Sequence, residues 1–201
     1  PHPKDIREDV AYAMAETPAV CEQLHLPLQS GSSRILRAMQ RGYTPERFLH
    51  KLRMVESIVP GLATSTDVIG GFPGETEEDF AGTLAVVEEA RFDQAYMFLY
   101  APRPGTRAAE MDGRVEPAVA AARFDRLVEL QQRITLEKNE ALVGTTVEVL
   151  TEGPSRKDPA VATTRTRTNK VVHLPGEWPP GEYLEAVVLS AAPSHLMGRL
   201  A

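Results

Sequence analysis

The chain has 201 residues, a length that suits one large domain or two modest ones. Its 42% hydrophobic and 25% charged residues are ordinary for a globular protein, and a net charge of −6 argues against general binding of polyanions. The only cysteine, Cys21, excludes a disulfide framework and a cysteine-based metal site within the chain. Neither a signal peptide nor an apolar run of membrane-spanning length occurs, so we expect a cytoplasmic protein with no membrane partner.

The first 141 residues alternate between helical and strand patterns. Apolar residues recur at helical spacing after capping residues such as Ser32 and Thr44, and β-branched or apolar runs separate the helices. This order predicts a parallel sheet wrapped by helices. The predicted helices span 5–16, a short segment between Ser32 and Gly42, Pro45 to Val59, a segment capped by Thr76, and about 117–141. The predicted strands span 20–28, the run that ends at Gly70, and 93–100; Cys21 lies in the first and is expected to be buried.

The stretch Thr66–Glu75 is the most informative in this first part. An apolar, β-branched run ends in the pair Gly70-Gly71, and an acidic helix start follows. In sheets built with crossover helices, ligands bind where strands end in this way, and glycines let a backbone approach them closely. Asp67 is an acid within the apolar strand, so we expect it to have a partner.

Gln29 and Arg41 form a candidate ligand site with Asp67. Gln29 follows one predicted strand, Arg41 ends the next helix, and Asp67 lies on the neighbouring strand. An arginine can hold a carboxylate with its two-pronged guanidinium, while an aspartate can accept from an amine or a ribose. On residue types alone, a buried structural network is the alternative.

Two further groups lie at the same end of the predicted sheet. Ile69, with the Phe98–Tyr100 strand end, can hold a flat ring such as adenine, although such residues usually belong to the core. Arg103 stands between two prolines on a stiff loop and can meet substrate, although an ordinary surface turn has the same composition.

The last 60 residues change in character. Five short candidate strands, separated by turn residues, predict a small closed OB-like barrel and a domain boundary near 141–143. The predicted strands span 145–151, 161–168, 171–174, 184–190 and 196–200. Between Gly153 and Lys170, five basic residues stand against one acid, Asp158, which predicts an RNA-binding patch, with a solvated strand face as the alternative. The candidate RNA-binding residues are Arg156, Lys157, Arg165, Arg167, Asn169 and Lys170.

Four motifs in order resemble the MiaB-type tRNA methylthiotransferases, which are radical S-adenosylmethionine (SAM) enzymes. These motifs are His25-Leu-Pro-Leu-Gln-Ser-Gly-Ser32, Asp67-Val-Ile-Gly-Gly-Phe-Pro-Gly-Glu-Thr76, Tyr100-Ala-Pro-Arg-Pro-Gly-Thr106 and Glu152-Gly-Pro-Ser-Arg-Lys-Asp-Pro159. The resemblance covers essentially the whole chain. It implies methylthiolation of isopentenyladenosine next to the tRNA anticodon.

The resemblance also implies an architecture. The family combines an N-terminal cluster domain, a radical SAM partial barrel and a C-terminal TRAM domain that binds tRNA. Residues 1–141 resemble the C-terminal half of the barrel, with parallel strands, and residues 142–201 resemble the TRAM domain. The two 4Fe-4S clusters of the full-length enzyme have no counterpart ligands here, since the CxxxCxxC loop is absent. We therefore expect no metal site and no catalytic residue within this chain, and no activity from it alone.

The resemblance assigns roles to single residues as well. It implies that SAM contacts Gln29, Ser30, Arg41, Asp67, Ile69, Phe98 and Tyr100, and that Arg103 lies at the substrate end. The expected partners are the tRNA anticodon arm and SAM, with self-association through the open barrel edge. Two alternatives stay open: a non-catalytic tRNA- or RNA-binding module, and a sibling enzyme acting on threonylcarbamoyl-adenosine.

Overall fold

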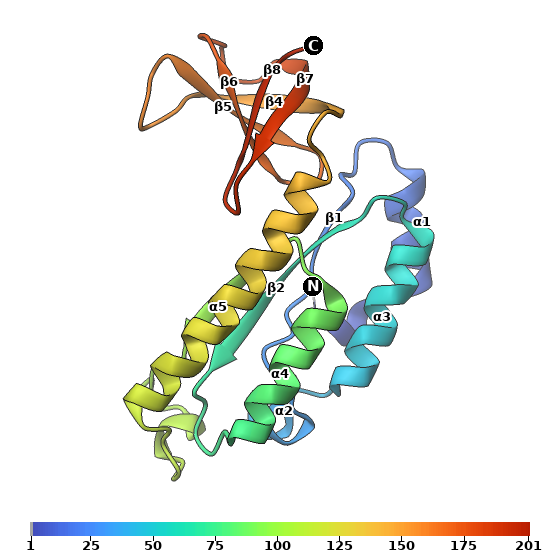
Figure 1. The fold of residues 1–201 in the computed structure, drawn as a ribbon. Coiled ribbons are helices and arrows are strands. Elements are labelled where there is room, and N and C mark those ends of the chain that lie inside the picture. Colours follow the sequence, from blue (N-terminus) through green and yellow to red (C-terminus); the bar gives the residue numbers. More distant parts are fainter. Residues whose placement is uncertain (1) are drawn as a thin grey trace. The chain divides into compact units, whose positions relative to one another are not determined.

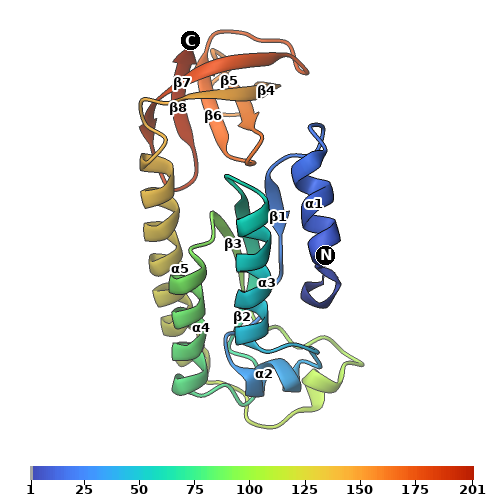
Figure 2. The same cartoon turned by 90° about the vertical axis from the view of Figure 1, so that its right-hand side faces the viewer.

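A computed structural model describes residues 2–201, which divide into two compact units. The first unit comprises the chain up to Val20 together with Leu24–Gln131, and the second comprises Cys21–Gln23 together with Gln132–Ala201. Each unit has its own sheet (Figures 1 and 2). Among the described residues, no helix combines the length and apolarity that crossing a bilayer requires.

The first unit contains the predicted parallel sheet, in the order β1-β2-β3. The middle strand β2 is Ala63–Gly70, β1 is Gln23–His25 and β3 is Gln94–Leu99. In Figure 2 the helices stand in a row along this sheet, from α1 through α3 and α4 to the first part of α5. The helices span η1 Pro3–Asp5, α1 Glu8–Glu16, α2 Ser33–Ala38, α3 Pro45–Ile58, α4 Glu77–Ala90, η2 Arg107–Glu110 and α5 Pro117–Glu140.

Capping residues explain where these helices begin. The Ser32 hydroxyl accepts from the amide of Ile35 at the start of α2, and Pro45 occupies the first turn of α3 behind the Thr44 cap. At the start of α4, Thr76 and Asp79 form a reciprocal capping box. The helix starts expected at Ser32, Thr44 and Thr76 are therefore confirmed, whereas α2 ends at Ala38, before Arg41.

Two expectations about the first strand are wrong. The strand β1 has three residues rather than nine, because turns occupy the preceding residues and Pro27 has no amide to donate to a sheet. Cys21 lies before β1 and is exposed, not buried. After the break at Pro27 the chain rejoins the sheet at Gln29, which forms a parallel bridge with Val68.

Sheet alternation places different chemistry on the two faces of β2. Thr66 and Val68 are fully buried on one face, whereas Asp67 and Ile69 are only half-buried on the other. The exposed aromatic residues Tyr96 and Phe98 of β3 lie opposite Asp67 and Ile69 in register. The open face of the sheet therefore carries both the polar and the ring-like groups.

Gly31 fixes the loop after β1 against helix α4. A Cβ at this position would lie 2.4 Å from the Gly82 carbonyl oxygen and 2.5 Å from the Thr83 Cα. The Gly31 amide also donates to the Thr83 hydroxyl at 2.9 Å. The loop that carries Gln29 can approach the helix this closely only because neither glycine has a side chain.

We expect Gly31→Ala to lower the free energy of unfolding by about 1–3 kcal/mol, because the new methyl group collides with backbone atoms that cannot rotate away. Gly42→Ala is the matched control, since no atom lies within 4 Å of its would-be Cβ, and it is expected to change stability by less than about 1 kcal/mol. Urea denaturation of both variants measures the difference. Equal stability of the two variants would contradict the packing argument.

The second unit is a closed barrel of five strands in the order β4-β5-β6-β8-β7. All pairs are antiparallel except β6 with β8. The strands are β4 Thr146–Pro154, β5 Val161–Thr166, β6 Val171–Pro175, β7 Tyr183–Ala191 and β8 Leu196–Leu200. Inward-facing residues form its core: Val149, Val172, Leu174, Ala186, Val188 and Leu196. The five short strands expected from the sequence are therefore confirmed.

The two compact units divide at Gln131/Gln132, within helix α5, whereas the predicted boundary lies at 141–143. The last turns of α5 are bound to the barrel. Asn139 donates from Nδ2 to the Ala192 carbonyl at 2.8 Å and accepts from Lys170 Nζ at 2.9 Å. The helical pattern of α5 continues through Gln131 and Gln132, so the sequence does not show where the helix stops contacting the first unit and starts contacting the barrel.

Candidate functional site

The backbone at Gln29 brings two predicted site residues together. The Gln29 amide donates to the Asp67 carbonyl at 2.7 Å, and the Ile69 amide donates to the Gln29 carbonyl at 2.9 Å. Gln29 is 6% exposed and has φ +66°, a left-handed conformation that is uncommon for a residue other than glycine. Such backbone strain is concentrated at functional sites. The structure therefore supports a functional reading of this strand end.

Tyr43 holds this strand end in place. Its hydroxyl lies 3.0 Å from the Pro27 carbonyl and 3.1 Å from the Leu28 carbonyl, and donates to them. Burial raises the pKa of Tyr43 to about 12, against the opposing effect of the nearby Arg41 charge. The phenol therefore keeps its proton, and Arg41 lies near the same strand end as Gln29.

His25 is the partner that Asp67 was expected to have. His25 Nε2 lies 3.2 Å from Asp67 Oδ2, and His25 Nδ1 lies 3.0 Å from the Ser65 hydroxyl. A carboxylate only accepts, so a neutral His25 ring carries its proton on Nε2 and accepts from Ser65. His25 was not among the residues predicted for the site. The HLPLQ motif alone did not specify the strand register that joins the two side chains.

The apolar part of the site lies beside the hydrogen-bonded group of Ser65, His25 and Asp67. Ile69 and Phe98 are register partners on adjacent strands, and Phe98 is 53% exposed. Tyr96, which the sequence analysis also missed, is the register partner of Asp67 and packs edge-on against His25 with ring centroids 5.9 Å apart. An exposed aromatic ring next to a branched aliphatic side chain suits stacking with a flat heterocycle.

Two polar atoms near this strand end are buried without a hydrogen-bond partner in the described chain: Arg41 Nε and the Tyr100 hydroxyl. Tyr100 packs edge-on against Phe72 at 5.2 Å between ring centroids, and its amide donates to the Gly70 carbonyl at 2.9 Å. Buried donors without partners are rare in folded proteins. A ligand with a carboxylate, an amine, hydroxyl groups and a heterocycle would satisfy them.

Ser30 differs from the other predicted cofactor contacts. It is 1% exposed, its hydroxyl accepts from the Ser32 amide at 3.2 Å, and it lies 3.5 Å from the Thr83 hydroxyl. These contacts shape the loop that follows Gln29. The structure thus gives Ser30 a role in the loop, and its contact with a cofactor stays a prediction.

Asp79 joins the loop after β1 to the loop after β2. It accepts from the Ser32 hydroxyl at 2.5 Å and pairs with Arg34, which also donates to the Gly74 carbonyl at 2.6 Å. Burial acts to raise the pKa of Asp79, but hydrogen bonds from Arg34, Ser32 and Thr76 outweigh it and hold that pKa well below its usual range. Asp79 is therefore ionised at neutral pH and fixes both loops.

Glu75 and Arg123 form a second anchor for the loop after β2. Both are 7% exposed, and Arg123 Nη1 donates at 3.1 Å to the Glu75 carbonyl and to its carboxylate. The other Glu75 oxygen accepts from the Gly71 amide at 3.2 Å. Burial raises the pKa of Glu75, against the Arg123 charge and the Gly71 hydrogen bond. Helix α5 thereby holds the Gly70-Gly71 turn.

The predicted RNA-binding residues lie in two different settings. Arg156 and Lys157 are exposed on the loop between β4 and β5. Arg165 instead pairs with Glu152 at 2.8 Å, and Arg167 pairs at 2.9 Å with Glu22 of the same compact unit. Lys170 donates to Asn139, and Asn169 accepts from Arg165. Arg156 and Lys157 are therefore the more accessible cations, and RNA contact by the whole set stays a prediction.

Arg103 is exposed on its loop, as expected for a residue at the substrate end. Its carbonyl accepts from the Thr106 amide at 3.2 Å and from the Thr106 hydroxyl at 2.7 Å, so the loop is a turn closed on itself. Its contact with a substrate stays a prediction.

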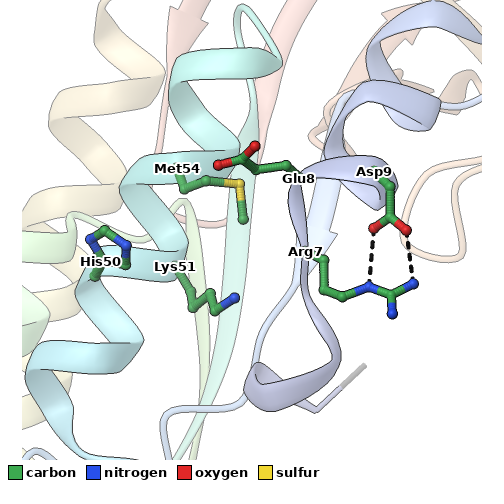
Figure 3. A pocket seen from close by; sticks show the side chains of 6 residues that line it. All are labelled: Arg7, Glu8, Asp9, His50, Lys51 and Met54. Atoms are coloured by element: carbon green, nitrogen blue, oxygen red, sulfur yellow. Dashed lines mark hydrogen bonds and ion pairs between the residues drawn. The ribbon is translucent and has the colours of Figure 1, made fainter.

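A surface hollow of about 410 Å³ lies away from the strand ends, between α1 and α3 (Figure 3). Figure 3 shows Arg7 turned toward Asp9, with which it forms an ion pair of 2.8 Å. Lys51 donates to the Ile6 carbonyl at 2.7 Å. Arg7, Asp9 and Lys51 are thus bound within the protein, whereas the strand ends hold the buried polar atoms without partners. Between residues 2 and 201, no three His, Cys, Asp or Glu side chains are grouped to hold a metal ion.

The parallel sheet and its polar end define a class of protein. Residues 2–87 match the family described as the Radical SAM superfamily. In fold, the chain is similar to the coproporphyrinogen III oxidase of Escherichia coli, described as a radical SAM enzyme, with a TM-score of 0.57 and 15% identity over 83% of this chain and 45% of that chain. The first part of the chain is therefore similar in sequence to the Radical SAM superfamily, and the chain is similar in fold to a radical SAM enzyme.

The chain as a whole is similar to proteins named tRNA-2-methylthio-N(6)-dimethylallyladenosine synthase. It is 52% identical over 202 residues to the protein of Mycolicibacterium paratuberculosis, and the aligned region covers 98% of this chain and 39% of that protein. It is 50% identical over 206 residues to that of Rhodococcus jostii, with 98% and 41% covered. The resemblance to MiaB-type methylthiotransferases is thereby confirmed, and the chain spans about two fifths of the length of these relatives.

Proposed function

We propose that this chain is the SAM-positioning and RNA-binding part of a tRNA methylthiotransferase that modifies isopentenyladenosine next to the anticodon. The observation that carries the proposal is the coincidence of orphaned polar atoms and an open aromatic face at one strand end. The names of relatives about 50% identical support the substrate class.

The residues at the strand end fit SAM. Arg41, whose Nε lacks a partner in the described chain, suits the methionyl carboxylate. Asp67, oriented by His25, suits the amine or the ribose, and Ile69 with Phe98 suits the adenine ring. When bound, SAM supplies the radical chemistry, while the chain binds and orients it and excludes water.

The residues do not fit an iron–sulfur cluster. Cys21 is exposed and stands alone, and the described residues 2–201 contain no metal-holding group. We therefore assign no cluster ligand and no cluster-dependent step to this chain, and we expect it to be inactive by itself.

We further propose that the five-stranded barrel is an OB-like TRAM domain covering residues 142–201, and that residues 1–141 are half of the partial barrel. The closed order of the five strands and the exposed basic loop with Arg156 and Lys157 support this assignment. The barrel holds the anticodon arm through phosphate contacts, and the target base is unstacked to reach the strand ends. Arg103 then lies at the substrate side of the site.

Binding of SAM to the isolated chain tests the first part of this proposal. We expect saturable binding in equilibrium dialysis, and an affinity about ten-fold weaker for Asp67→Ala, because a charged hydrogen bond is lost. Asp125→Ala, which removes an exposed acid of α5, is the control and should bind as the unaltered chain does. RNA binding without SAM binding would instead favour the non-catalytic RNA-binding module.

A further inference from the structure

The barrel has a groove of about 720 Å³ on its outer face. Strands β5, β6 and β8 supply one wall, and the loop between β4 and β5 supplies the rim. The groove lies entirely within the second compact unit. Neither of the two histidines that line it was among the residues the sequence analysis singled out for RNA binding.

Strand register explains why these side chains meet. His173 of β6 is the register partner of Thr163 on β5 and of Met197 on β8. Its neighbours Val172 and Leu174 point into the barrel core, so His173 points outward. Val161 and Val171, which also line the groove, make its floor partly apolar.

Two histidine rings face each other in the groove. The rings of His173 and His195 have centroids 5.2 Å apart at an angle of 59°, and the Ser194 hydroxyl lies 3.0 Å from His195 Nδ1. His173 Nδ1 is buried and has no hydrogen-bond partner in the described chain. Burial, together with the nearby His173 and Lys157, lowers the pKa of His195, so this ring is neutral at pH 7. Neutral imidazole rings can stack on a base and hydrogen-bond to its edge.

The rim of the groove has a surplus of positive charge. Within residues 2–201, Arg156 and Lys157 form no ion pair. Of the two acids that line the groove, Glu152 is paired with Arg165 at 2.8 Å, and Asp158 accepts from the Ala160 amide at 3.0 Å. The Glu152 charge is balanced by Arg165, so a phosphate at the rim meets two cations, Arg156 and Lys157, against the single negative charge of Asp158.

We propose that this groove holds one unstacked nucleotide of single-stranded RNA, with its base against His173, His195 and Met197 and its phosphate at Arg156 and Lys157. The proposal rests on the RNA-binding role proposed above and locates it. It places base contact on β6 and β8, and it excludes Arg165 and Arg167 as principal contacts, because their guanidinium groups are already paired.

Fluorescence anisotropy with a short labelled single-stranded RNA tests this placement on the full 201-residue chain. We expect the double variant His173→Ala/His195→Ala to weaken binding on the order of ten-fold, with an unchanged salt dependence, because it removes stacking and leaves both phosphate-binding cations in place. Arg156→Ala/Lys157→Ala is expected to weaken binding and to reduce the slope of log K against log salt by roughly 0.7, the single-strand value for one phosphate contact. Tyr183→Ala, which removes a 69% exposed aromatic ring of β7, is the matched control.

RNA of the same length with abasic positions provides a readout that needs no altered protein. We expect such RNA to bind the unaltered chain about as weakly as intact RNA binds the double histidine variant, and duplex RNA and free adenosine monophosphate to bind more weakly than the single strand. Full RNA affinity in both double variants would show that RNA does not bind in this groove, and it would still agree with the proposed RNA-binding role of the chain. A chain that binds no RNA at all would overturn both. Circular dichroism of each variant confirms that the barrel is folded.

Discussion

Arg123→Ala is expected to lower the free energy of unfolding by roughly 3–5 kcal/mol, the largest stability loss that any single side chain of the site should cause. Arg123 and Glu75 are each 7% exposed, and their ion pair has an N–O distance of 3.1 Å. Removal of the guanidinium leaves a buried carboxylate with only the Gly71 amide as partner. Chemical denaturation monitored by circular dichroism measures the loss.

Arg126→Ala is the matched control for this prediction. Arg126 lies one turn along α5 and pairs with Glu77 at 2.5 Å, but both side chains are at least half exposed. Solvent screens such a pair, so its removal should cost less than about 1 kcal/mol. A similar loss in both variants would show that burial of the Arg123 pair is not what matters.

The loss caused by Arg123→Ala should also depend on pH. Burial raises the pKa of Glu75 in the folded state, and the Arg123 charge opposes that rise. Without Arg123 the pKa of Glu75 in the folded state rises further. The folded variant therefore keeps the Glu75 proton at pH values where the unfolded chain has already released it. The stability of the variant is then greatest below the unfolded pKa and falls as the pH rises through the folded pKa. The gap to the unaltered chain is expected to shrink as the pH falls from 7 into the acid range.

Local signals in the sequence were enough to predict most of the fold. The caps at Ser32, Thr44 and Thr76 marked helix starts, because each supplies a hydroxyl to free amides of the first turn. Alternating residues marked the barrel strands, because one face of each had to be buried. The first strand was predicted too long, because the prediction ran through Pro27, which has no amide to donate to the sheet.

The site was only partly predictable, because its partners are distant in sequence. That Asp67 needs a partner follows from the cost of burying a charge, but that the partner is His25 follows only from the strand register. Arg123 is 48 residues from Glu75, and no periodicity connects them. The pairing of Arg165 with Glu152 likewise depends on a barrel hairpin that the sequence pattern does not specify.

Arg41→Met is expected to separate stability from binding. Arg41 Nε is buried without a partner in the described chain, so its removal should leave the free energy of unfolding unchanged or raise it by up to about 1 kcal/mol. The same change should weaken SAM binding roughly a hundred-fold, because a ligand carboxylate loses its two-pronged cation. Denaturation and equilibrium dialysis on the same protein sample measure the two effects.

Arg37→Met supplies the control for Arg41→Met, because Arg37 is an exposed arginine of α2, the short helix that ends three residues before Arg41. It should change neither quantity. If Arg41→Met instead lost stability and kept its SAM affinity, Arg41 would be a structural residue of the loop. A buried guanidinium nitrogen without a hydrogen-bond partner destabilises the fold, and a bound anion at Arg41 would offset that loss. Stability that is preserved while affinity falls would therefore identify Arg41 as a ligand contact.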